Sequence, residues 1–334
     1  MGMHKKALVT GVAGFVMSHV AAELLEHGWS VVGLDNYQSH GAAQLDFVGH
    51  PHYTHVIGDA RDGQLLGRLL DDCSDCIAGA AHCGGSGYLR DHSYEIYRDN
   101  QRLTEAAVEA ALAHHARGRL RRLTLISSSM VFEQAHSFPV ADVDQIPAPR
   151  QGYGFQKLAA QRLAEAAALQ YGLPYGVLIY FNHAGPGRYA GASVPRLPEQ
   201  VLPELARRIL ASGAPVEIWG DGQQRRHFTH GRDLARGTRL ALDAPAAAGR
   251  ALQIASPEST TVLQAARSLW QLLRPDQEFA YSLRGPVAGD VLTQMPDCQP
   301  ARELLGFEAC HSLRDILQEI VAAIRQEARQ APAL

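Results

Sequence analysis

The stretch that decides the fold is ALVTGVAGFVM, which spans residues 7–17. Its apolar run Ala7–Thr10 predicts a buried strand, and the pattern over Val16–His27 predicts a helix. Gly11 and Gly14 lie in the turn between them. Glycines there let the backbone turn tightly and approach a pyrophosphate at the helix N-terminus, where free N–H groups favour negative charge. The stretch therefore predicts a dinucleotide-binding loop, with an ordinary strand–helix turn as the alternative.

A carboxylate follows at the distance that such a loop requires. The glycine spacing is G-x-x-G, and Met17 stands where a third glycine would complete the longer fingerprint. The second predicted strand ends in Leu34-Asp35-Asn36, about 20 residues further on. Asp35 would accept hydrogen bonds from ribose hydroxyls and repel a 2′-phosphate, which favours NAD over NADP. Asp59, after the third strand, is placed to contact adenine, with a turn and helix cap as the alternative.

Short β-branched runs alternate with longer helical patterns through the first half of the chain. The alternation predicts a Rossmann α/β fold, a doubly wound parallel sheet over residues 1–182, with ligands beyond the carboxyl ends of the strands. Residues 183–334 are predicted to form a smaller mixed α/β C-terminal substrate lobe, with some strand and helix exchange back to the first domain. Further strands are expected at Val31–Leu34, Thr54–Ile57, Cys76–Ala81, Arg122–Ser127, Gly176–Tyr180 and Val216–Trp219, and further helices at Gln64–Asp71, Glu95–His115, Tyr153–Tyr171 and Glu199–Ser212.

Composition excludes several classes of protein. With 46% hydrophobic residues the 334-residue chain is too apolar for disorder, and its net charge of -3 gives no basic surface for nucleic acid. No apolar run approaches the ~20 residues that cross a bilayer. His4-Lys5-Lys6 resembles the start of a signal peptide, but glycines interrupt the apolar run and no cleavage site is present, which favours the cytoplasm. Five cysteines fit a reducing compartment, and the isolated pair Cys73-x-x-Cys76 lacks further ligands, so no metal is expected.

A tyrosine and a lysine four residues apart form the candidate catalytic pair. Tyr153 and Lys157 share one face of a predicted helix, and Ser127-Ser128-Ser129 ends the preceding strand. Lys157 is one of three lysines among 31 basic residues, which indicates a position that requires a compact ammonium. Tyrosine has a pKa of ~10, so its use as a base requires a shift of ~3 units, or ~4 kcal/mol. One charge ~4 Å away at an effective dielectric of ~20 supplies ~4 kcal/mol, while desolvation opposes the shift.

Further motifs follow one another along nearly the whole chain. They are Thr10-Gly11-x-x-Gly14-Phe15-Val16, Leu34-Asp35-Asn36, Gly58-Asp59-x-Arg61-Asp62, Ala80-Ala81, Asn100-x-x-x-Thr104, Ser127-Ser128-x-x-Val131-Phe132, Tyr153-Gly154-Phe155-Gln156-Lys157, Phe181-Asn182-x-x-Gly185-Pro186-Gly187 and Gly220-Asp221-Gly222-Gln223-Gln224-x-Arg226-x-Phe228. In order and spacing they resemble the extended short-chain dehydrogenase/reductases that act on nucleotide sugars, the epimerases and dehydratases.

The resemblance implies a role for each matching residue. Tyr153 is the expected base, Lys157 holds the nicotinamide ribose and tunes Tyr153, and Ser128 relays the proton. The expected NAD contacts are Gly11, Ala13, Gly14, Phe15, Val16, Asp35, Asn36, Asp59, Ala60, Ala80, Ala81, His82, Asn100, Ser127, Tyr153, Lys157 and Phe181. The expected contacts to a nucleotide-diphosphate sugar are Gly85, Ser86, Tyr88, Ser128, Ser129, Met130, Asn182 and Arg226, with Asn182 and Arg226 on the diphosphate.

Departures from the family pattern narrow the expected chemistry. Ser129-Met130 stands where the 4,6-dehydratases carry an Asp-Glu pair, so the usual acid and base for eliminating water are absent. The Gly84–Tyr88 segment looks like the glycine-rich loop of GDP-mannose 3,5-epimerases, but their cysteine acid would align at Met130. Glu133 replaces a usual glycine, and His227 replaces a common acidic residue.

The leading hypothesis is an NAD-dependent nucleotide-sugar epimerase, most simply a 4-epimerase, which works through a transient keto-sugar. The alternatives are a 3,5-epimerase-like enzyme, an atypical dehydratase that uses Glu133, Tyr88 or His82, and a non-catalytic NAD sensor or scaffold. The helices Glu95–His115 and Tyr153–Tyr171 are expected to pair with a second copy as a four-helix bundle, as in the family, which makes a homodimer. The sequence names neither the nucleotide, the sugar nor the reacting carbon.

Overall fold

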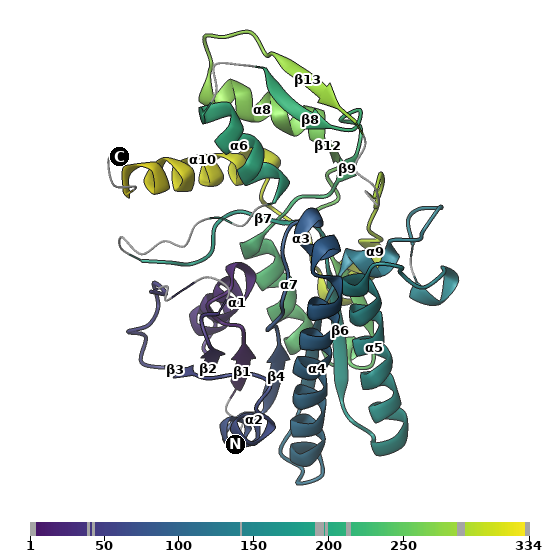
Figure 1. The fold of residues 1–334 in the computed structure, drawn as a ribbon. Coiled ribbons are helices and arrows are strands. Elements are labelled where there is room, and N and C mark those ends of the chain that lie inside the picture. The colour runs from purple at the N-terminus through teal and green to yellow at the C-terminus, as the bar shows by residue number, and fades with distance from the viewer. Residues whose placement is uncertain are drawn as a thin grey trace.

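The centre of the molecule is a seven-stranded sheet in which every adjacent pair of strands is parallel. The computed structural model describes residues 5–38, 41, 44–140, 142–190, 197, 200–211, 215–285 and 291–330. The strand order β11-β6-β5-β4-β1-β2-β3 is that of the doubly wound dinucleotide-binding fold, which confirms the predicted fold class (Figure 1). The strands are β1 (Lys6–Thr10), β2 (Ser30–Asp35), β3 (Tyr53–Ile57), β4 (Asp75–Ala78), β5 (Arg122–Ser128), β6 (Tyr175–Tyr180) and β11 (Ala251–Ile254).

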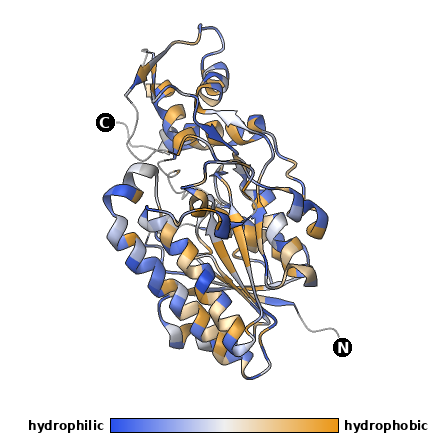
Figure 2. Ribbon diagram, turned by 90° about the vertical axis from the view of Figure 1, so that its right-hand side faces the viewer, coloured by the Kyte–Doolittle hydropathy of each residue, from blue (hydrophilic) through white to orange (hydrophobic). Residues whose placement is uncertain are grey.

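Helices cover both faces of this sheet. On one face α1 packs along α7, and on the other α4 packs between α2 and α5. Figure 2 shows hydrophobic strands in the sheet beside helices that carry both hydrophilic and hydrophobic residues. Each face has its own buried core, one around Trp29 and Leu24 and the other around Leu66 and Leu123. The helices are α1 (Phe15–Glu26), α2 (Gly63–Leu70), α3 (Ser86–Asp91), α4 (Ser93–His115), α5 (Gly152–Tyr171), α7 (Gly231–Asp243) and α9 (Gln299–Leu305).

A smaller lobe lies beyond the carboxyl ends of the strands (Figure 1). It has a third core, in which buried residues of α6, α8 and α10 pack together with those of β8. Thr261 and Gln264 form a capping box that starts α8. The lobe contains α6 (Val201–Ala211), β8 (Val216–Trp219), α8 (Val262–Leu273), β13 (Tyr281–Arg284) and α10 (Leu313–Gln330).

Segments after residue 183 alternate between the lobe and the sheet. β11 adds to the sheet beside β6, and α7 lies against α1. Short strand pairs join the two regions: β7 (His183–Ala184) with β10 (Thr229–His230), and β9 (Arg225–Arg226) with β12 (Thr260–Thr261). The site therefore lies between segments that are distant in sequence.

The fourth strand is shorter than the sequence predicts. Strand β4 ends at Ala78 rather than Ala81, because the N–H groups of Gly79 and Ala80 donate to the Thr10 hydroxyl oxygen, each at 3.1 Å. The chain thereby leaves the sheet at the level of the glycine turn. Among the described residues, no helix combines the length and apolarity needed to cross a bilayer.

Candidate active site

The catalytic candidates meet at the carboxyl edge of the sheet. Ser128 is the last residue of β5, and its side chain is hydrogen-bonded to the Tyr153 hydroxyl. Gly154 lets α5 approach the strand end, since a Cβ there would lie 2.5 Å from the Met130 carbonyl oxygen. The predicted serine and tyrosine are thus in direct contact.

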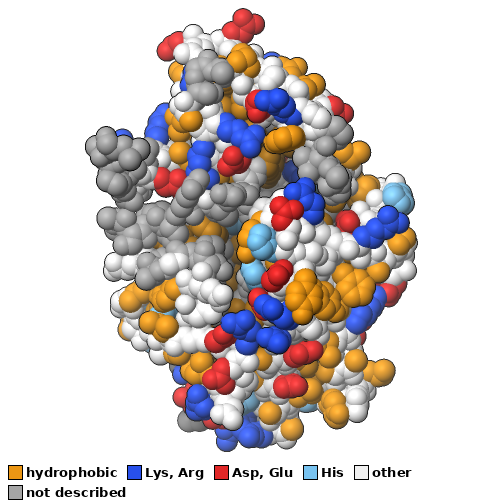
Figure 3. Space-filling model, viewed as in Figure 1, with side chains coloured by type: hydrophobic (Ala, Val, Ile, Leu, Met, Phe, Trp, Pro, Cys, Tyr) orange, Lys and Arg blue, Asp and Glu red, His pale blue; other side chains and the backbone are white. Residues whose placement is uncertain are grey.

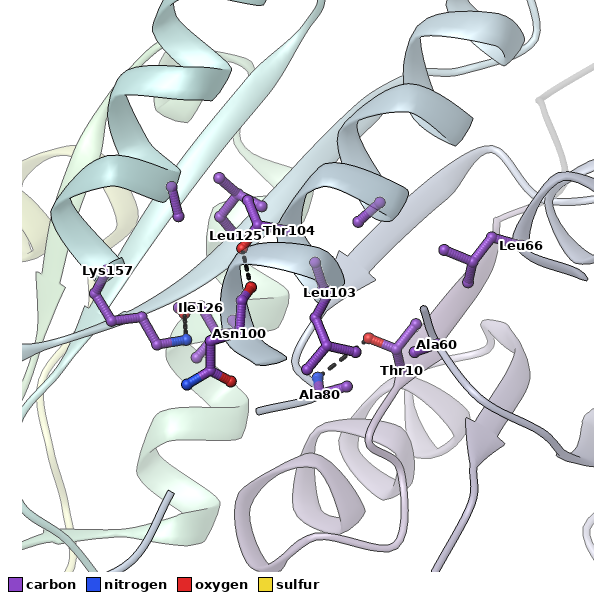
Figure 4. Close-up of a pocket in the computed structure, with 13 residues that line it drawn as sticks. Thr10, Ala60, Leu66, Ala80, Asn100, Leu103, Thr104, Leu125, Ile126 and Lys157 are labelled. Atoms are coloured by element: carbon purple, nitrogen blue, oxygen red, sulfur yellow. Dashed lines mark hydrogen bonds between the residues drawn. The ribbon is translucent and has the colours of Figure 1, made fainter. Parts of the chain in front are cut away.

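Lys157 lies one turn further along α5, on the same face as Tyr153. Its buried ammonium donates to the Ile126 carbonyl oxygen at 2.9 Å and lies 5.6 Å from the centroid of the Tyr153 ring. Figure 4 shows the Lys157 side chain directed at this carbonyl. Burial lowers the pKa of Lys157 to about 8.

The expected lowering of the Tyr153 pKa is not seen in the protein alone. Burial raises the pKa of the Tyr153 phenol well above its ordinary value, the nearby Cys83 thiol adds to this, and the hydrogen bond with Ser128 partly offsets it. Lys157 is directed at Ile126 and is not among the groups that shift the Tyr153 pKa. From the sequence, the Lys157 charge was expected to outweigh the effect of burial on the Tyr153 pKa. In the structure, burial has the larger effect.

The turn between β1 and α1 fits a dinucleotide. Gly11 has φ +73°, and a Cβ there would lie 2.7 Å from the Ala80 Cα, so only glycine fits without displacing backbone. Gly14 is the N-cap of α1 and supplies no side-chain acceptor. The N-terminus of α1 therefore has no side-chain cap, and the positive end of the helix dipole suits an external anion such as a pyrophosphate. Phe15 and Val16 begin this helix.

The carboxylates at the adenosine end are held in different ways. Asp35 accepts the N–H groups of Ala13 (2.9 Å) and Tyr37 (2.8 Å), one on each oxygen, which fixes it beside the glycine turn. Asp59 is paired with the Arg61 guanidinium, the closest contact being 2.6 Å. That pairing lowers the pKa of Asp59 and neutralises its charge. Asp35 is thus fixed at the end of β2 beside the glycine turn, whereas Asp59 is paired with its own cation.

Other predicted cofactor residues shape the loop after β4. The Asn100 side chain accepts the His82 N–H (2.7 Å) and donates to the His82 carbonyl (2.8 Å), so it fixes the loop backbone. Asn100 and Lys157 line a small cavity of about 20 Å³, together with Thr10 and Ala80 (Figure 4). A cavity of this size holds about one water molecule and is too small for a dinucleotide.

Two predicted cofactor contacts lie inside the core. Phe181 is 1% exposed and packs against Phe132 with ring centroids 6.0 Å apart, so it offers only its backbone to a ligand. The Ser127 hydroxyl is buried and has no partner in the described structure. Asn36 directly follows β2, Ala60 is buried in the turn after β3, and Ala81 lies in the loop after β4, three residues beyond the end of that strand.

Several predicted substrate residues lie just beyond the ends of β5 and β6 and on β9. Ser129 donates to the side-chain oxygen of Gln294 (3.0 Å), whose amide nitrogen donates back to the Ser129 carbonyl (2.9 Å). Asn182 accepts the His227 N–H at 3.0 Å, and Arg226 donates to the Val291 carbonyl at 2.7 Å. These contacts tie the ends of β5 and β6 to the lobe.

The loop after β4 carries the other substrate candidates. Gly85 is the N-cap of α3, Ser86 opens this helix, and Tyr88 lies within it. The Tyr88 hydroxyl is 2.8 Å from His82 Nε2, and His82 Nδ1 is 3.2 Å from an Asp99 carboxylate oxygen. Glu133, by contrast, accepts the N–H groups of residues 150 and 151 at the start of α5, so it has a structural role.

Three residues at this site were not predicted from the sequence. Gln294 contacts Ser129 from 165 positions away, and no local pattern marks it. Asp99 lies one residue before the Asn100 motif. Its contact with His82 could not be predicted without the path of the loop after β4. Cys83 is exposed beside Tyr153 and Lys157 and directly follows His82.

Among the described residues, one group has side chains close enough to share a metal ion: Asp233, Cys310 and His311. Both oxygens of the buried Asp233 carboxylate accept backbone N–H groups, from Cys310 at 3.1 Å and from His311 at 3.0 Å. Asp233 thus anchors the segment between α9 and α10 to the start of α7. The pair Cys73 and Cys76 is buried and belongs to the core under α2.

Comparison with known proteins identifies the family. The family model for the NAD dependent epimerase/dehydratase family matches residues 7–255. A UDP-glucose 4-epimerase of Halalkalibacterium halodurans is 30% identical over 244 residues, 71% of this chain and 70% of its own. A UDP-N-acetyl-alpha-D-glucosaminuronate decarboxylase of Bacillus cytotoxicus is 26% identical and covers 97% of this chain and 99% of its own.

Solved structures agree on the fold. The UDP-glucose 4-epimerase of Thermotoga maritima, solved with UDP-glucose, is 25% identical, has a TM-score of 0.78 and covers 97% of this chain and 99% of its own. The UDP-glucuronic acid 4-epimerase of Bacillus cereus, solved with UDP-glucuronic acid and NAD, has a TM-score of 0.81 at 24% identity and covers 96% and 99%. Relatives with different reactions share this architecture, so the reaction is a separate question. The match over three quarters of the sequence shows that this chain belongs to the NAD dependent epimerase/dehydratase family.

Proposed function

We propose that the protein is an NAD-dependent nucleotide-sugar epimerase, most simply a 4-epimerase, with Tyr153 as its base. The observation that carries the proposal is the contact of the Tyr153 hydroxyl with Ser128, with the Lys157 ammonium on the same helix face. In this role Tyr153 takes the proton of a sugar hydroxyl, and Ser128 holds the phenol in line and passes the proton. Bound NAD would accept a hydride from the same sugar carbon and return it.

The residues of this chain would hold the two ligands on opposite sides of Tyr153. The N–H groups at the start of α1 and the Asp35 carboxylate suit the pyrophosphate and a ribose of the cofactor. Lys157 suits the nicotinamide ribose. Asn182 and Arg226 would bind the diphosphate of the substrate from the lobe side, because a guanidinium matches phosphate oxygens.

The absence of carboxylates beside Ser128 supports epimerisation over dehydration. Ser129 is held by Gln294, and Glu133 holds the start of α5, so neither offers a free acid. Oxidation and return of hydride at one carbon require an acid–base group for one hydroxyl, and Tyr153 would supply it. An atypical dehydratase remains the second candidate because of the His82–Tyr88 contact.

The test is direct. Purified protein is incubated with UDP-, dTDP- and GDP-hexoses, and the products are resolved by chromatography and mass spectrometry. The expected product is an epimer of unchanged mass. Loss of one water from the product would move the assignment to a dehydratase, and binding of NAD without turnover of any donor would favour a sensor or scaffold.

Two further parts of the proposal concern assembly and location. We place a homodimer interface on α4 and α5, since these helices lie side by side and leave Tyr94, Phe155 and Leu169 exposed.

We also assign the protein to the cytoplasm. All five cysteines are free, two of them buried as thiols, which suits a reducing compartment.

A further inference from the structure

We propose that Tyr88, His82 and Asp99 form a second acid–base relay that acts on the sugar at a carbon beside the one that is oxidised. The proposal rests on the proposed function, because the proton it moves becomes acidic only after a neighbouring hydroxyl has become a ketone. It assigns these three residues to one proton path, separate from Tyr153.

The relay is a continuous chain of three side chains. The Tyr88 hydroxyl lies 2.8 Å from His82 Nε2, and His82 Nδ1 lies 3.2 Å from Asp99 Oδ2. The side chains come from α3, from the loop after β4 and from α4. This is the order of groups in an acid–histidine–hydroxyl triad, with a phenol as the outer group.

The carboxylate fixes the tautomer of the histidine. Asp99 Oδ2 can only accept, so His82 Nδ1 carries the hydrogen and Nε2 presents its lone pair to the Tyr88 hydroxyl. The other Asp99 oxygen is held by Arg98 at 2.9 Å and lies 3.7 Å from Arg61. Asp99 therefore lies between two guanidinium groups and His82, and its carboxylate orients the imidazole ring.

The loop after β4 places this relay close to Tyr153 and Lys157. The Asn100 amide holds the His82 backbone on both sides, and the next residue, Cys83, is exposed beside Tyr153 and Lys157. Helix α3 packs against α5, the helix that carries Tyr153. Figure 3 shows histidine, acidic and basic side chains close together near the middle of this face.

The outer end of the relay is accessible. Tyr88 is 40% exposed, and its ring stacks on His92 with centroids 4.2 Å apart, which holds the hydroxyl in place. Gly84 lets the loop turn over the ring, since a Cβ there would lie 2.6 Å from the Tyr88 Cδ1. The phenol oxygen therefore has one side on His82 and its other side open to a ligand.

The chemistry is an enolisation. The Tyr88 oxygen takes the proton from the carbon beside the ketone as it passes its own proton to His82 Nε2. The electron pair of the broken C–H bond moves through the new C=C bond onto the ketone oxygen, which gives an enolate. Return of a proton to carbon restores the ketone, so no net oxidation occurs. This step is shared by epimerisation at that carbon and by elimination next to it. A plain 4-epimerase needs neither the step nor the relay.

The first experiment follows deuterium. The protein is incubated in D2O with UDP-glucose, dTDP-glucose and GDP-mannose, and NMR and mass spectrometry measure C–D bonds formed per sugar oxidised. The wild type is expected to place deuterium on a carbon beside the oxidised one, because the relay exchanges its protons with solvent. Tyr88→Phe and His82→Asn should each lower this ratio by about 100-fold, the usual contribution of one acid–base group. Tyr281→Phe, which removes an exposed hydroxyl from strand β13 of the smaller lobe, should leave it unchanged.

Two results would overturn the relay while leaving the proposed function intact. One is turnover of the sugar with no deuterium on carbon in the wild type. The other is deuterium incorporation that persists in both relay variants. If no sugar is oxidised, the proposed function fails instead, and the relay is then decided by a measurement that needs no turnover.

That measurement is NMR of the histidine ring nitrogens, assigned with the His82→Asn variant. The relay requires a neutral His82 that carries its hydrogen on Nδ1, and Asp99→Asn should change the Nδ1 signal together with the population of that tautomer. Tyr88→Phe should shift the Nε2 signal, since that nitrogen loses its donor. A wild-type His82 with its hydrogen on Nε2, or one unaffected by either change, would contradict the proposal.

Discussion

The side chain of Met17 fills the space that Gly79 leaves open: a Cβ on Gly79 would lie 2.1 Å from the Met17 sulfur. In the longer dinucleotide fingerprint a third glycine on the helix allows α1 to approach the sheet closely. Here the helix carries the large side chain and the loop after β4 carries the glycine. The close approach is preserved with the small residue on the other partner, so the missing glycine of the fingerprint does not argue against a cofactor site.

This pairing predicts a coupled loss of stability. Gly79→Ala should reduce the free energy of unfolding by about 1–3 kcal/mol, as expected for overpacking. In a Met17→Ala background the same change should cost less, although contact with the Thr10 carbonyl at 2.9 Å remains. Urea denaturation of the four proteins measures the coupling. Gly67→Ala, whose Cβ would meet nothing within 4 Å, is the control. Equal costs in both backgrounds would refute the pairing.

The Ser128–Tyr153 contact predicts the effect of removing either hydroxyl. Tyr153→Phe should lower kcat by about 10²- to 10⁴-fold, the range for one acid–base group, while NAD binding is retained. Ser128→Ala should lower it less, since it leaves the phenol in place. Steady-state kinetics on the accepted sugar donor measure both effects. Tyr171→Phe, at the far end of the same helix, serves as control. A Tyr153→Phe variant within tenfold of wild type would reject this tyrosine as the base.

Two glycines at positive φ allow the effect of backbone strain to be distinguished from the effect of a steric clash. Gly11→Ala and Gly28→Ala both place a side chain at positive φ, +73° and +77°, but only the first meets backbone atoms. Gly28→Ala should therefore cost about 1 kcal/mol of stability and leave NAD affinity unchanged. Gly11→Ala should cost more and weaken NAD binding, because the turn and Ala80 must move apart. Calorimetric titration with NAD and urea denaturation separate the two outcomes. Equal NAD affinity in both variants would contradict the prediction that the Gly11 turn contacts the cofactor.

Buried histidine predicts a loss of stability in mild acid. Burial lowers the pKa of His19 to about 4, from 6.5, against a weaker opposing effect of its hydrogen bond with Pro186. Between these two pH values His19 is protonated in the unfolded chain but neutral in the folded chain. The free energy of unfolding therefore decreases as the pH falls through this range. The loss from pH 7 to pH 5 is about 2 kcal/mol for this one group. Urea denaturation at both pH values should show a smaller loss in His19→Gln. The exposed His136→Gln should behave as wild type, and a full loss in His19→Gln would contradict the assignment.

The exposed apolar face of α5 predicts self-association. Leu169 is 91% exposed, which is unusual for a leucine on a long helix of a soluble monomer. Leu169→Asp should shift the protein from dimer to monomer in analytical ultracentrifugation at micromolar concentration. Leu283→Asp in the smaller lobe, at a residue 52% exposed, should not. A wild-type monomer, or a dimer that survives Leu169→Asp, would place the interface elsewhere or remove it.

Local periodicity was enough to predict most elements of the first half. The strand Arg122–Ser127 and the helix Tyr153–Tyr171 each begin or end within one residue of the structure, because buried strands and long helices have strong periods of their own. The Tyr153–Lys157 pair was found in the same way. Its environment was not, since desolvation depends on what packs around α5, and the raised Tyr153 pKa followed from that.

The parts that escaped prediction depend on distant contacts. Gln294 meets Ser129 across 165 residues, and Glu133 binds the start of α5 rather than a ligand. The Phe181 side chain turns into the core although its position in the motif suggested a cofactor contact. In each case residue type and local spacing were known, but the direction of the side chain was set by the tertiary fold.

Two hydrogen bonds join Gln294 to Ser129 at the end of the strand β5. The same amide binds both the hydroxyl and the carbonyl of Ser129, so the segment that carries Gln294 cannot move away from β5 without breaking both bonds. Such a movement would cost about 1–3 kcal/mol. The two bonds therefore favour one position of this segment beside the strand end, and a sugar that binds next to Tyr153 would meet an edge that is already in place.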